Sequence, residues 1–312
     1  MNAPTAKPAG DAAPLACTDL GVRARGTALL AGVTLEARRG ELLAVLGPNG
    51  AGKSTLIGAL AGDLALASGS VRLGGDDLAT LTHRERARRR AVLLQQNPIA
   101  FPFTVREVVA MGRAPWGDDA GVDAAIARLR LDGLAGRVVR TLSVGEQARV
   151  AMARVLAQDA PVMLLDDPTA VLDIGQQKSL MAIVHGLVAE GRAVVAVLHD
   201  LNLAMTHADR VLVLNGGAVV AEGSPRTVLT DAVLSDVYDQ RVRVVEVPGH
   251  SSPLVTIDPS RLPRPTAATR ERRRRRGRET TRGRARRRGR SSPFWNAGTA
   301  PVPRRRARGP TR

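Results

Sequence analysis

The chain has one cysteine, three lysines, six aromatic residues and no long hydrophobic run. The single cysteine, Cys17, excludes an internal disulfide and any metal centre built from several cysteines, so we expect it to be a small buried side chain. No segment approaches the roughly 18 consecutive apolar residues of a membrane-spanning helix. The start of the chain also lacks the apolar core of a secretory signal, which predicts a protein made and kept in the cytosol.

The net charge of +17 is concentrated in one part of the chain. Residues 261–312 contain 20 arginines and two acids, whereas the preceding 260 residues contain 26 basic and 27 acidic side chains. A segment so rich in like charge, Pro, Gly and Ser buries too little apolar surface to offset its chain entropy. We therefore expect residues 251–312 to be a disordered Arg-rich tail, and the Pro- and Ala-rich residues 1–12 to be a disordered leader.

Residues 13–250 alternate between strand-like and helical patterns and should form one domain. The continuous apolar run 42–46 is typical of a strand buried on both faces. Alternation of strands with helices predicts a parallel sheet covered by helices on both sides. Residues from about 97 to 158 have mainly helical periodicity, which predicts an inserted helical subdomain. Further strand-like runs lie at 162–165, 193–198 and 211–214, with helical patterns at 174–190 and 201–208.

A phosphate-binding loop follows the apolar run 42–46. Its glycines let backbone N–H groups surround anionic oxygens at the start of a helix. Lys53 stands in a chain with only three lysines and 43 arginines, so a compact ammonium is indicated at this place, able to reach between the β- and γ-phosphates of a nucleotide. The hydroxyl of Ser54 would bind Mg²⁺. The loop consists of Gly47, Pro48, Asn49, Gly50, Ala51, Gly52, Lys53 and Ser54, with Thr55 next in the helix.

Two carboxylates follow the second apolar strand, at residues 162–165. At the carboxyl end of a strand in the same sheet, Asp166 is placed to hold Mg²⁺, directly or through water. Asp167 would lie on the other side of the strand end and polarise an attacking water molecule. An apolar strand that ends in acids is a weak signal alone, and its value here comes from the phosphate loop upstream.

The order of these motifs, together with Leu-Ser-Val-Gly-Glu-Gln at 142–147 and His199-Asp200, resembles the ATP-binding subunits of ABC transporters. The resemblance covers roughly residues 13–250. It implies an α/β P-loop NTPase fold, with a RecA-like parallel sheet, an antiparallel β edge and an inserted α-helical subdomain. It also implies an ATPase that acts as a homodimer, in which ATP lies between Lys53 of one copy and Ser143 of the other.

The resemblance assigns roles to residues that would mean little in isolation. Gln95 matches the glutamine that senses Mg²⁺ and the attacking water, and His199 matches the histidine that contacts the γ-phosphate. The implied catalytic residues are Asp167, His199 and Gln95, and the implied Mg²⁺ ligands are Ser54, Gln95 and Asp166. The implied ATP contacts outside the phosphate loop are Ser143, Gly145, Glu146 and Asp173.

The sequence departs from the family pattern in three places. Asp167 stands where the family usually has glutamate, which retracts the carboxylate by one methylene. Val144 replaces the usual central glycine of the Ser/Gly motif. Residues 22–26 offer no aromatic side chain for adenine, so either an arginine stands in or recognition of the base is loose. We expect the shorter Asp167 to slow hydrolysis with nucleotide binding and dimerisation intact. The added bulk of Val144 beside the γ-phosphate could weaken the ATP-bound dimer.

Residues 95–109 and 111–116 resemble most the haemin-import ATP-binding subunits, and less closely those for ferric siderophores and cobalamin. This implies two transmembrane permease subunits, a periplasmic haem-binding protein, and a peripheral location on the cytoplasmic face of the inner membrane. Three of the six aromatic residues, Phe101, Phe103 and Trp116, lie in this region. They indicate either a permease-docking surface or a small core of the helical subdomain.

Other interpretations remain open at this point. A soluble ABC-type ATPase could act on nucleic acid or ribosomes through the Arg-rich tail, or the tail could bind anionic lipid. The tail could equally be an extended reading of GC-rich DNA. Asp167 and Val144 together would also suit a regulator that binds ATP without hydrolysing it.

Overall fold

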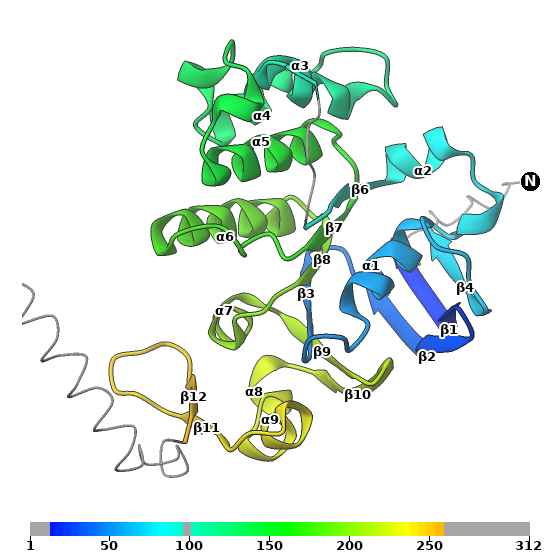
Figure 1. The fold of residues 1–312 in the computed structure, drawn as a ribbon, viewed down its shortest axis with the longest axis vertical. Helices are drawn as coiled ribbons and strands as arrows, with labels where there is room; N and C mark the ends of the chain where they lie inside the picture. Colours follow the sequence, from blue (N-terminus) through cyan, green and yellow to red (C-terminus); the bar gives the residue numbers. More distant parts are fainter. Residues whose placement is uncertain (1–12, 96–100, 259–312) are drawn as a thin grey trace, which may run out of the picture. The chain divides into compact units, whose positions relative to one another are not determined.

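A six-stranded sheet forms the centre of the part of the chain that the computed structural model describes, residues 13–95 and 101–258 (Figure 1). Its strand order is β10-β9-β3-β8-β7-β6, and neighbouring strands are parallel except for the β9–β10 hairpin. This confirms the predicted α/β fold with a mainly parallel sheet. The strands are β3 (Glu41–Leu46), β6 (Arg90–Leu93), β7 (Val162–Asp166), β8 (Ala193–Val197), β9 (Arg210–Asn215) and β10 (Ala218–Gly223).

Strand β3 is apolar on both faces because each face packs into a different hydrophobic cluster. Leu42, Ala44 and Leu46 belong to one cluster, while Leu43 and Val45 belong to the other. Alternate residues of a strand point to opposite faces, so a strand covered on both sides is a continuous apolar run in the sequence.

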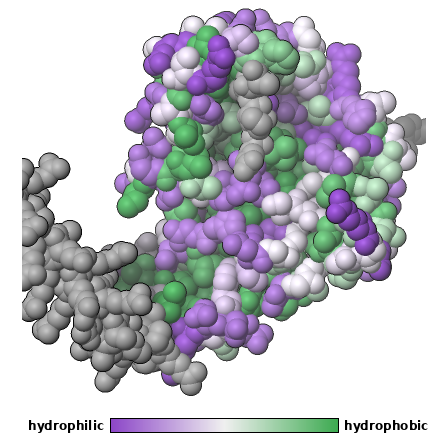
Figure 2. Space-filling model, viewed as in Figure 1, coloured by the Kyte–Doolittle hydropathy of each residue, from purple (hydrophilic) through white to green (hydrophobic). Residues whose placement is uncertain are grey.

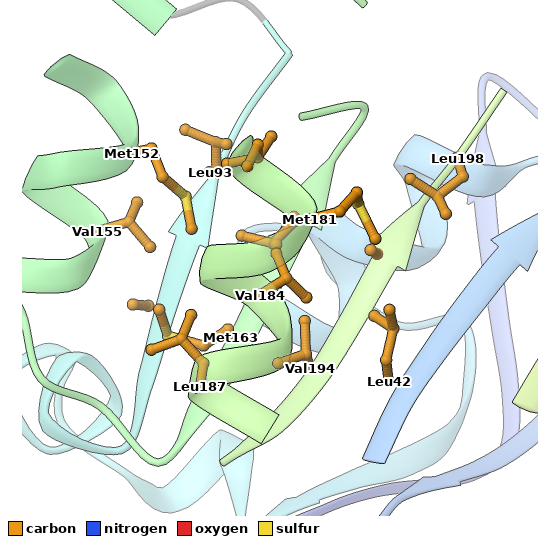
Figure 3. Close-up of a cluster of buried hydrophobic side chains, with 14 of the residues drawn as sticks. Leu42, Leu93, Met152, Val155, Met163, Met181, Val184, Leu187, Val194 and Leu198 are labelled. Carbon is orange, nitrogen blue, oxygen red and sulfur yellow. The ribbon is translucent and has the colours of Figure 1, made fainter. Parts of the chain in front are cut away.

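Helix α6 (Ile174–Ala189) covers one face of this sheet (Figure 3). Its side chains Met181, Val184 and Leu187 lie between the strands and helix α5 (Val144–Ala157). Met152 of α5 faces the same cluster. At about 25 cal/mol per Å² of buried apolar surface, such a cluster is the main stabilising contribution to the fold.

A second, antiparallel sheet of order β2-β1-β4-β5 packs with helix α1 (Lys53–Ala61) over the other face. It contributes Leu20 and Val22 of β1 to the cluster that also holds Leu56 and Leu60 of α1. This sheet is the expected antiparallel β edge. Its strands are β1 (Leu15–Ala24), β2 (Thr27–Ala37), β4 (Ser68–Leu73) and β5 (Asp76–Asp77), followed by the 3₁₀ turn η1 (Leu78–Thr80) and helix α2 (His83–Arg89).

Helices dominate residues 101–158, which lie above the sheet in Figure 1. An isolated bridge between Thr104 and Val138 is the one β-type pairing in this stretch. Thr104 also begins helix α3 with a capping box, because its side chain accepts from the backbone of Glu107 and Glu107 accepts from Thr104 in return. The other elements are α3 (Val105–Ala110), η2 (Met111–Arg113), α4 (Val122–Arg128), η3 (Asp132–Leu134), η4 (Val139–Thr141) and α5. The start predicted for the helical subdomain, at 97, lies outside the described residues.

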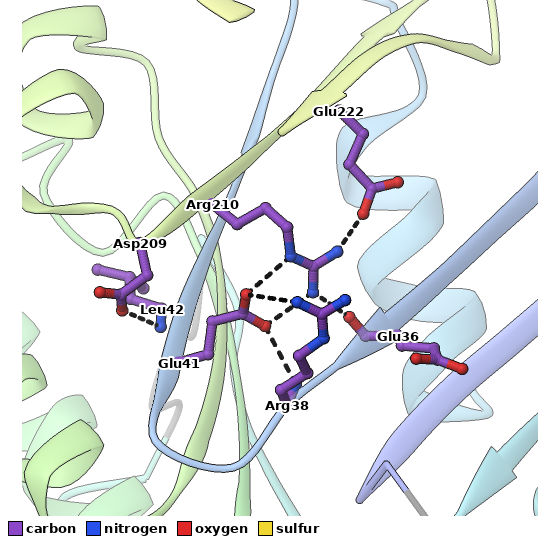
Figure 4. Close-up of polar contacts among 7 residues, drawn as sticks. All are labelled: Glu36, Arg38, Glu41, Leu42, Asp209, Arg210 and Glu222. Atoms are coloured by element: carbon purple, nitrogen blue, oxygen red, sulfur yellow. Dashed lines mark hydrogen bonds and ion pairs between the residues drawn. The ribbon is translucent and has the colours of Figure 1, made fainter. Parts of the chain in front are cut away.

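A partly buried ion network joins the two sheets where β3 and β9 begin (Figure 4). Two of the three guanidinium nitrogens of Arg210, Nε and Nη2, donate to the Glu41 carboxylate at 2.7 Å. The same guanidinium pairs with Glu222 of β10 and donates to the backbone oxygen of Glu36 in β2. Because four strands meet at this one side chain, Arg210 fixes the antiparallel sheet and the β-hairpin onto the central sheet.

The described part of the chain ends in a small C-terminal layer. Helices α7 (Leu201–His207), α8 (Pro225–Val228) and α9 (Asp231–Tyr238) lead to an antiparallel pair, β11 (Val242–Val245) and β12 (Leu254–Ile257). The domain boundary that we predicted at residue 250 falls inside this hairpin, because β12 pairs with β11 and extends the folded part past the connecting loop. The leader 1–12 and residues 259–312 lie outside the described residues. In the described ranges, no helix is long and apolar enough to cross a bilayer.

Candidate functional site

The phosphate loop leaves β3 at its carboxyl end and turns sharply into α1. Gly47 has a φ of 141°, and a Cβ at this position would lie 2.1 Å from the backbone oxygen of Leu214. Gly52, which caps α1, has a φ of 101°, and its Cβ would lie 2.7 Å from the Leu30 side chain. Only glycine fits at these two positions, because the backbone conformation and the neighbouring atoms both exclude a side chain.

The Lys53 side chain curls back into this loop. Its Nζ atom donates to the backbone oxygens of Gly47 at 2.7 Å and Pro48 at 2.8 Å. Burial lowers the pKa of Lys53, and the nearby carboxylates Asp166 and Asp167 act in the opposite direction. The ammonium group is therefore held within the loop, at the place where the sequence predicted a phosphate-binding cation.

Ser54 and Asp166 meet beside the loop, as their positions at strand and helix ends predict. The Ser54 hydroxyl donates to Oδ1 of Asp166 at 3.2 Å. Hydroxyl and carboxylate oxygens are the ligands that Mg²⁺ prefers, so this donor set fits the predicted metal. Thr55 follows in the first turn of α1 and is half-buried.

Asp167 is the most constrained residue of the site. Its φ of 52° is in the left-handed region, and its side chain is buried. Oδ2 accepts from the Gln95 amide at 3.2 Å and lies 3.4 Å from Nε2 of His199. The other oxygen, Oδ1, is buried without a hydrogen-bond partner among the described residues. Such an acceptor is costly to leave unpaired and is therefore a candidate to bind water or substrate.

Burial raises the pKa of Asp167, and the positive potential of His199 is the largest effect that opposes the shift. The raised pKa means that the fold holds this carboxylate at a cost. Perturbed carboxylates of this kind concentrate at functional sites. Gln95 follows β6, and His199 follows β8 with 45% of its side chain exposed. The structure thus brings the three predicted catalytic residues together.

The Ser143 group lies on the helical subdomain. Ser143 caps α5, because its Oγ accepts from the backbone of Glu146 and its own N–H and hydroxyl both contact the Glu146 carboxylate at 2.8 Å. In the described part of the chain, no hydrogen bond joins Ser143, Gly145 or Glu146 to the phosphate loop. The structure therefore leaves this predicted half of the site apart from Lys53 within one copy.

Asp173 caps the neighbouring helix α6 in the same manner. Its carboxylate accepts from the backbone N–H of Gln176 at 2.8 Å. In the other direction, the backbone N–H of Asp173 donates to Oε1 of Gln176 at 3.4 Å. A Cβ on Gly145 would lie 2.9 Å from Oε1 of Gln176, so the starts of α5 and α6 are in contact. Sequence reasoning missed Gln176, although the Asp-x-x-Gln spacing is a capping-box pattern that could have identified it.

Exposed apolar side chains surround these two helix starts. Val144, Val171 and Ile174 are 63, 55 and 85% exposed. Figure 2 shows hydrophobic residues at the surface over α5 and α6, among mainly hydrophilic neighbours. A cavity of about 1140 Å³ continues between the two helices and reaches Gln95 and Asp167. Exposed apolar groups of this kind mark an interaction surface.

Known proteins of similar sequence support the same assignment as the geometry of the site. A family described as ABC transporter matches residues 30–170. The chain is 52% identical over 223 residues to the hemin import ATP-binding protein HmuV of Nocardia farcinica, covering 69% of this chain and 77% of that protein. It is 49% identical over 251 residues to the HmuV of Streptomyces coelicolor, covering 78% and 89%. The chain belongs to the ABC transporter ATP-binding proteins.

A solved structure of this family agrees with the fold. The ATP-binding cassette MJ0796, solved as a dimer in a post-hydrolysis state with ADP and Pi, has a TM-score of 0.63 and 26% identity. It covers 68% of this chain and 99% of its own. The resemblance drawn from the motifs is therefore confirmed, and so is the P-loop NTPase fold.

The aromatic residues Phe101, Phe103 and Trp116 differ in their exposure, which bears on whether they form a docking surface or a small core. Phe101 is 67% exposed, whereas Phe103 packs against the core of the helical subdomain. Trp116 is half-buried, and its indole N–H donates to the backbone oxygen of Gln158 at 2.8 Å. The guanidinium of Arg88 stacks on the same ring at 4.9 Å from its centroid. Of these three, Phe101 is exposed, whereas Phe103 and Trp116 are half-buried.

Proposed function

We propose that the protein is the ATP-binding and ATP-hydrolysing subunit of a haemin importer. The observation that carries the proposal is the arrangement of Lys53, Asp166 and Asp167 at the carboxyl edge of the central sheet. The substrate class is supported by two relatives, 52 and 49% identical, that are both hemin import ATP-binding proteins. The site chemistry supports the ATPase part, because the ATP-binding subunit supplies energy and has no need to contact haemin.

The phosphates of ATP would bind in the loop 47–54. Backbone N–H groups at the start of α1 point toward this position, where the helix dipole favours negative charge. Lys53 would exchange the backbone oxygens of Gly47 and Pro48 for phosphate oxygens, and a bound phosphate would favour the charged form that burial disfavours. Binding and charge compensation would therefore act together at this side chain.

Mg²⁺ would be held by Ser54, Asp166 and the side-chain oxygen of Gln95, and would neutralise charge that develops on the β- and γ-phosphates. Asp167 would use the unpaired Oδ1 atom to accept a hydrogen bond from the attacking water. His199, beside Oδ2 of the same carboxylate, would contact the γ-phosphate. The protein's contribution is thus to position the water and the phosphate rather than to form a covalent intermediate.

Two copies of the chain would complete the site. Ser143 and Gly145 would offer a hydroxyl and a backbone N–H to the γ-phosphate held by the partner copy, because within one copy they do not reach the phosphate loop. The exposed Val171 and Ile174 beside Asp173 would be covered in this dimer. We propose further that the dimer binds two transmembrane permease subunits at the cytoplasmic face of the inner membrane, with Phe101 in the docking surface, and that a periplasmic haem-binding protein delivers the substrate.

Purified protein with Mg-ATP tests the ATPase part. We expect ATP to bind and to convert monomers to dimers in light scattering, most clearly in Asp167→Asn, which would retain the nucleotide. Lys53→Ala should do neither. If the wild type neither bound ATP nor paired, and Lys53→Ala behaved identically, the proposal would fail. Vesicles that contain the permease pair would then test the substrate, with ferric siderophore and cobalamin as competitors of haemin uptake.

The charge of residues 261–312, 20 arginines against two acids, favours a second candidate partner, a nucleic acid. An ATPase that acted on RNA through this segment would bind it with a steep salt dependence. Deleting residues 263–312 and measuring RNA binding between 50 and 200 mM salt, about the range in which such contacts weaken most, separates the two functions. For an importer subunit, we expect unchanged ATPase activity after this deletion.

A further inference from the structure

Helix α7 carries the chain away from His199 and is only seven residues long. His199 lies two residues before its first residue, Leu201, and 45% of the histidine side chain is exposed. In the described part of the chain, Asp167 is the only polar partner recorded for its ring, at 3.4 Å. Packing around the imidazole therefore does little to fix it, and its position depends on the backbone between β8 and α7.

The Asn202 side chain ties α7 to the C-terminal hairpin. Its amide group donates from Nδ2 to the backbone oxygen of Val255 at 3.2 Å. In return, the backbone N–H of Val255 donates to Oδ1 of Asn202 at 2.7 Å. One side chain thus satisfies both backbone groups of one residue in β12, which is the pairing that a neighbouring strand would otherwise supply.

The strand held by Asn202 is itself anchored. Val255 lies opposite Val244 of β11, and the N–H of Val244 donates to the carboxylate of Asp231 in α9 at 2.6 Å. Ser235 of α9 also exchanges hydrogen bonds with the backbone of Val242. The hairpin is therefore fixed to α9 at two places, so it is a rigid support for α7 and not a free end of the chain.

The other end of α7 is tied to α6. His207, the last residue of α7, has its Nδ1 atom 2.9 Å from Nε2 of His185 in α6. At the N-terminal end, the Asp200 carboxylate accepts from the backbone N–H groups of Asn202 and Leu203 and so caps the helix. A helix of this length is not stable by itself, and these contacts to its surroundings determine where it lies.

We propose that Asn202 is a positioning residue for ATP hydrolysis: by fastening α7 to strand β12, it holds His199 at the γ-phosphate and against Asp167. The inference rests on the proposed role of His199. Asn202 itself would touch neither the nucleotide nor the water. Loss of its two hydrogen bonds would let α7 shift, and the imidazole would lose its place. Displacement of a reacting group by about 1 Å can cost a hundredfold in rate, so a partial displacement of His199 should be readily measured.

The test uses the full chain, four single variants and one double variant. Asn202→Leu keeps the volume and removes both hydrogen bonds, and Asn202→Asp keeps the acceptor for the Val255 N–H. His199→Ala is the reference, and Thr206→Ala, at an exposed position of α7, is the matched control. We expect Asn202→Leu to lower kcat about tenfold with little change in the KM for ATP, because nucleotide binding uses other residues. Asn202→Asp keeps one of the two bonds but places a carboxylate oxygen against the Val255 carbonyl oxygen, so it should also lower kcat, whereas Thr206→Ala should match the wild type.

The double variant His199→Ala/Asn202→Leu decides between positioning and general loss of structure. If Asn202 acts through His199, the double variant should have the kcat of His199→Ala alone, since residues that act as a unit are not additive. A further loss in the double variant would overturn the inference, as would normal kcat in Asn202→Leu while His199→Ala is impaired. If His199→Ala itself had no effect, the proposed role of His199 would be wrong and the inference would fall with it. Should Asn202→Leu not fold, Asn202→Asp in both backgrounds gives the same comparison.

Discussion

The Oδ2 atom of Asp167 lies 3.4 Å from Nε2 of His199, and both contacts of this carboxylate use that one oxygen. Gln95 supplies the second contact, so three strand ends of the central sheet converge on a single acceptor atom. The Oδ1 atom has no partner in the described residues, although it is buried. This asymmetry separates the oxygen that positions the residue from the oxygen that is available for chemistry.

Replacing Asp167 by asparagine should lower the rate of ATP hydrolysis and raise the stability of the fold. Asp167→Asn keeps the shape, tolerates the left-handed backbone, and removes a charge that burial disfavours. Because the folded-state pKa of Asp167 is raised above its unfolded value of 3.8, the folded protein binds the proton more tightly. Its stabilising contribution is present below that pH and is lost as pH rises through the folded pKa.

We therefore expect Asp167→Asn to melt higher than the wild type at pH 7, by roughly 2–4 °C for each kcal/mol gained, and to hydrolyse ATP hardly at all. The difference in melting temperature should shrink toward pH 4. Calorimetry at several pH values measures it, with Asp173→Asn as a control at an exposed carboxylate. An advantage of Asp167→Asn that did not change with pH would contradict the assignment of the effect to charge burial.

The sequence was sufficient to predict the parts of the site that arise from local pattern. The β3–loop–α1 unit follows from a strand-length apolar run, glycines and helical spacing, all within 20 residues of each other. The contact of Ser54 with Asp166 followed because the carboxyl ends of parallel strands meet at one edge of a sheet. These predictions needed no knowledge of which distant segments pair.

The features that could not be predicted depend on distant pairing or on backbone conformation. Strand β12 is defined by its register with β11, and the Asn202–Val255 contact depends on that hairpin. The left-handed conformation of Asp167 has no sequence signal beyond the tolerance of aspartate for it. Likewise, nothing in the pattern around Trp116 indicated that arginines would stack on its ring.

A longer carboxylate at position 167 should speed the reaction. The family resemblance places glutamate there, and Asp167→Glu would extend the carboxylate toward the attacking water by one methylene. We expect kcat to rise by about tenfold or more with an unchanged affinity for ATP, because a misplacement of about 1 Å costs up to a hundredfold. Steady-state ATPase kinetics measure it, with Asp166→Glu as the control expected to lose activity through the Ser54 contact. A normal turnover number that Asp167→Glu leaves unchanged would show that the shorter side chain is already optimal.

Glycine substitutions should separate folding from dimerisation. Gly145→Ala places a methyl group against the flexible end of Gln176, and alanine favours a helix by about 1 kcal/mol over glycine. We expect an unchanged or higher melting temperature but weaker ATP-dependent dimerisation, because the backbone N–H could no longer approach the partner's phosphate closely. Gly47→Ala, whose Cβ would lie 2.1 Å from the Leu214 oxygen, should instead yield little folded protein. Light scattering and melting curves distinguish these cases, and strong dimerisation of Gly145→Ala would argue against close contact at that glycine.

The last prediction concerns the ion network of Figure 4. The side chains of Arg210 and Glu41 are 11 and 12% exposed and share two hydrogen bonds. Removing the cation leaves this largely buried carboxylate with only the backbone N–H of Arg38 at 3.3 Å and the Arg38 guanidinium at 3.9 Å. The pairing with Arg210 holds the pKa of Glu41 below its usual value against the opposing effect of burial, the largest single effect on this group. We expect Arg210→Ala to destabilise the protein by about 3 kcal/mol.

The matched control is Arg226→Ala, because Arg226 and Glu246 form an ion pair whose side chains are 57 and 70% exposed. Such surface pairs contribute less than about 1 kcal/mol, so this variant should unfold at nearly the same urea concentration as the wild type. Urea denaturation at pH 7 measures both. If Arg210→Ala and Arg226→Ala destabilised the protein equally, the four strands that meet at Arg210 would have to be held together by their apolar faces alone. The ion network would then serve only to determine which edge of the central sheet the antiparallel sheet contacts.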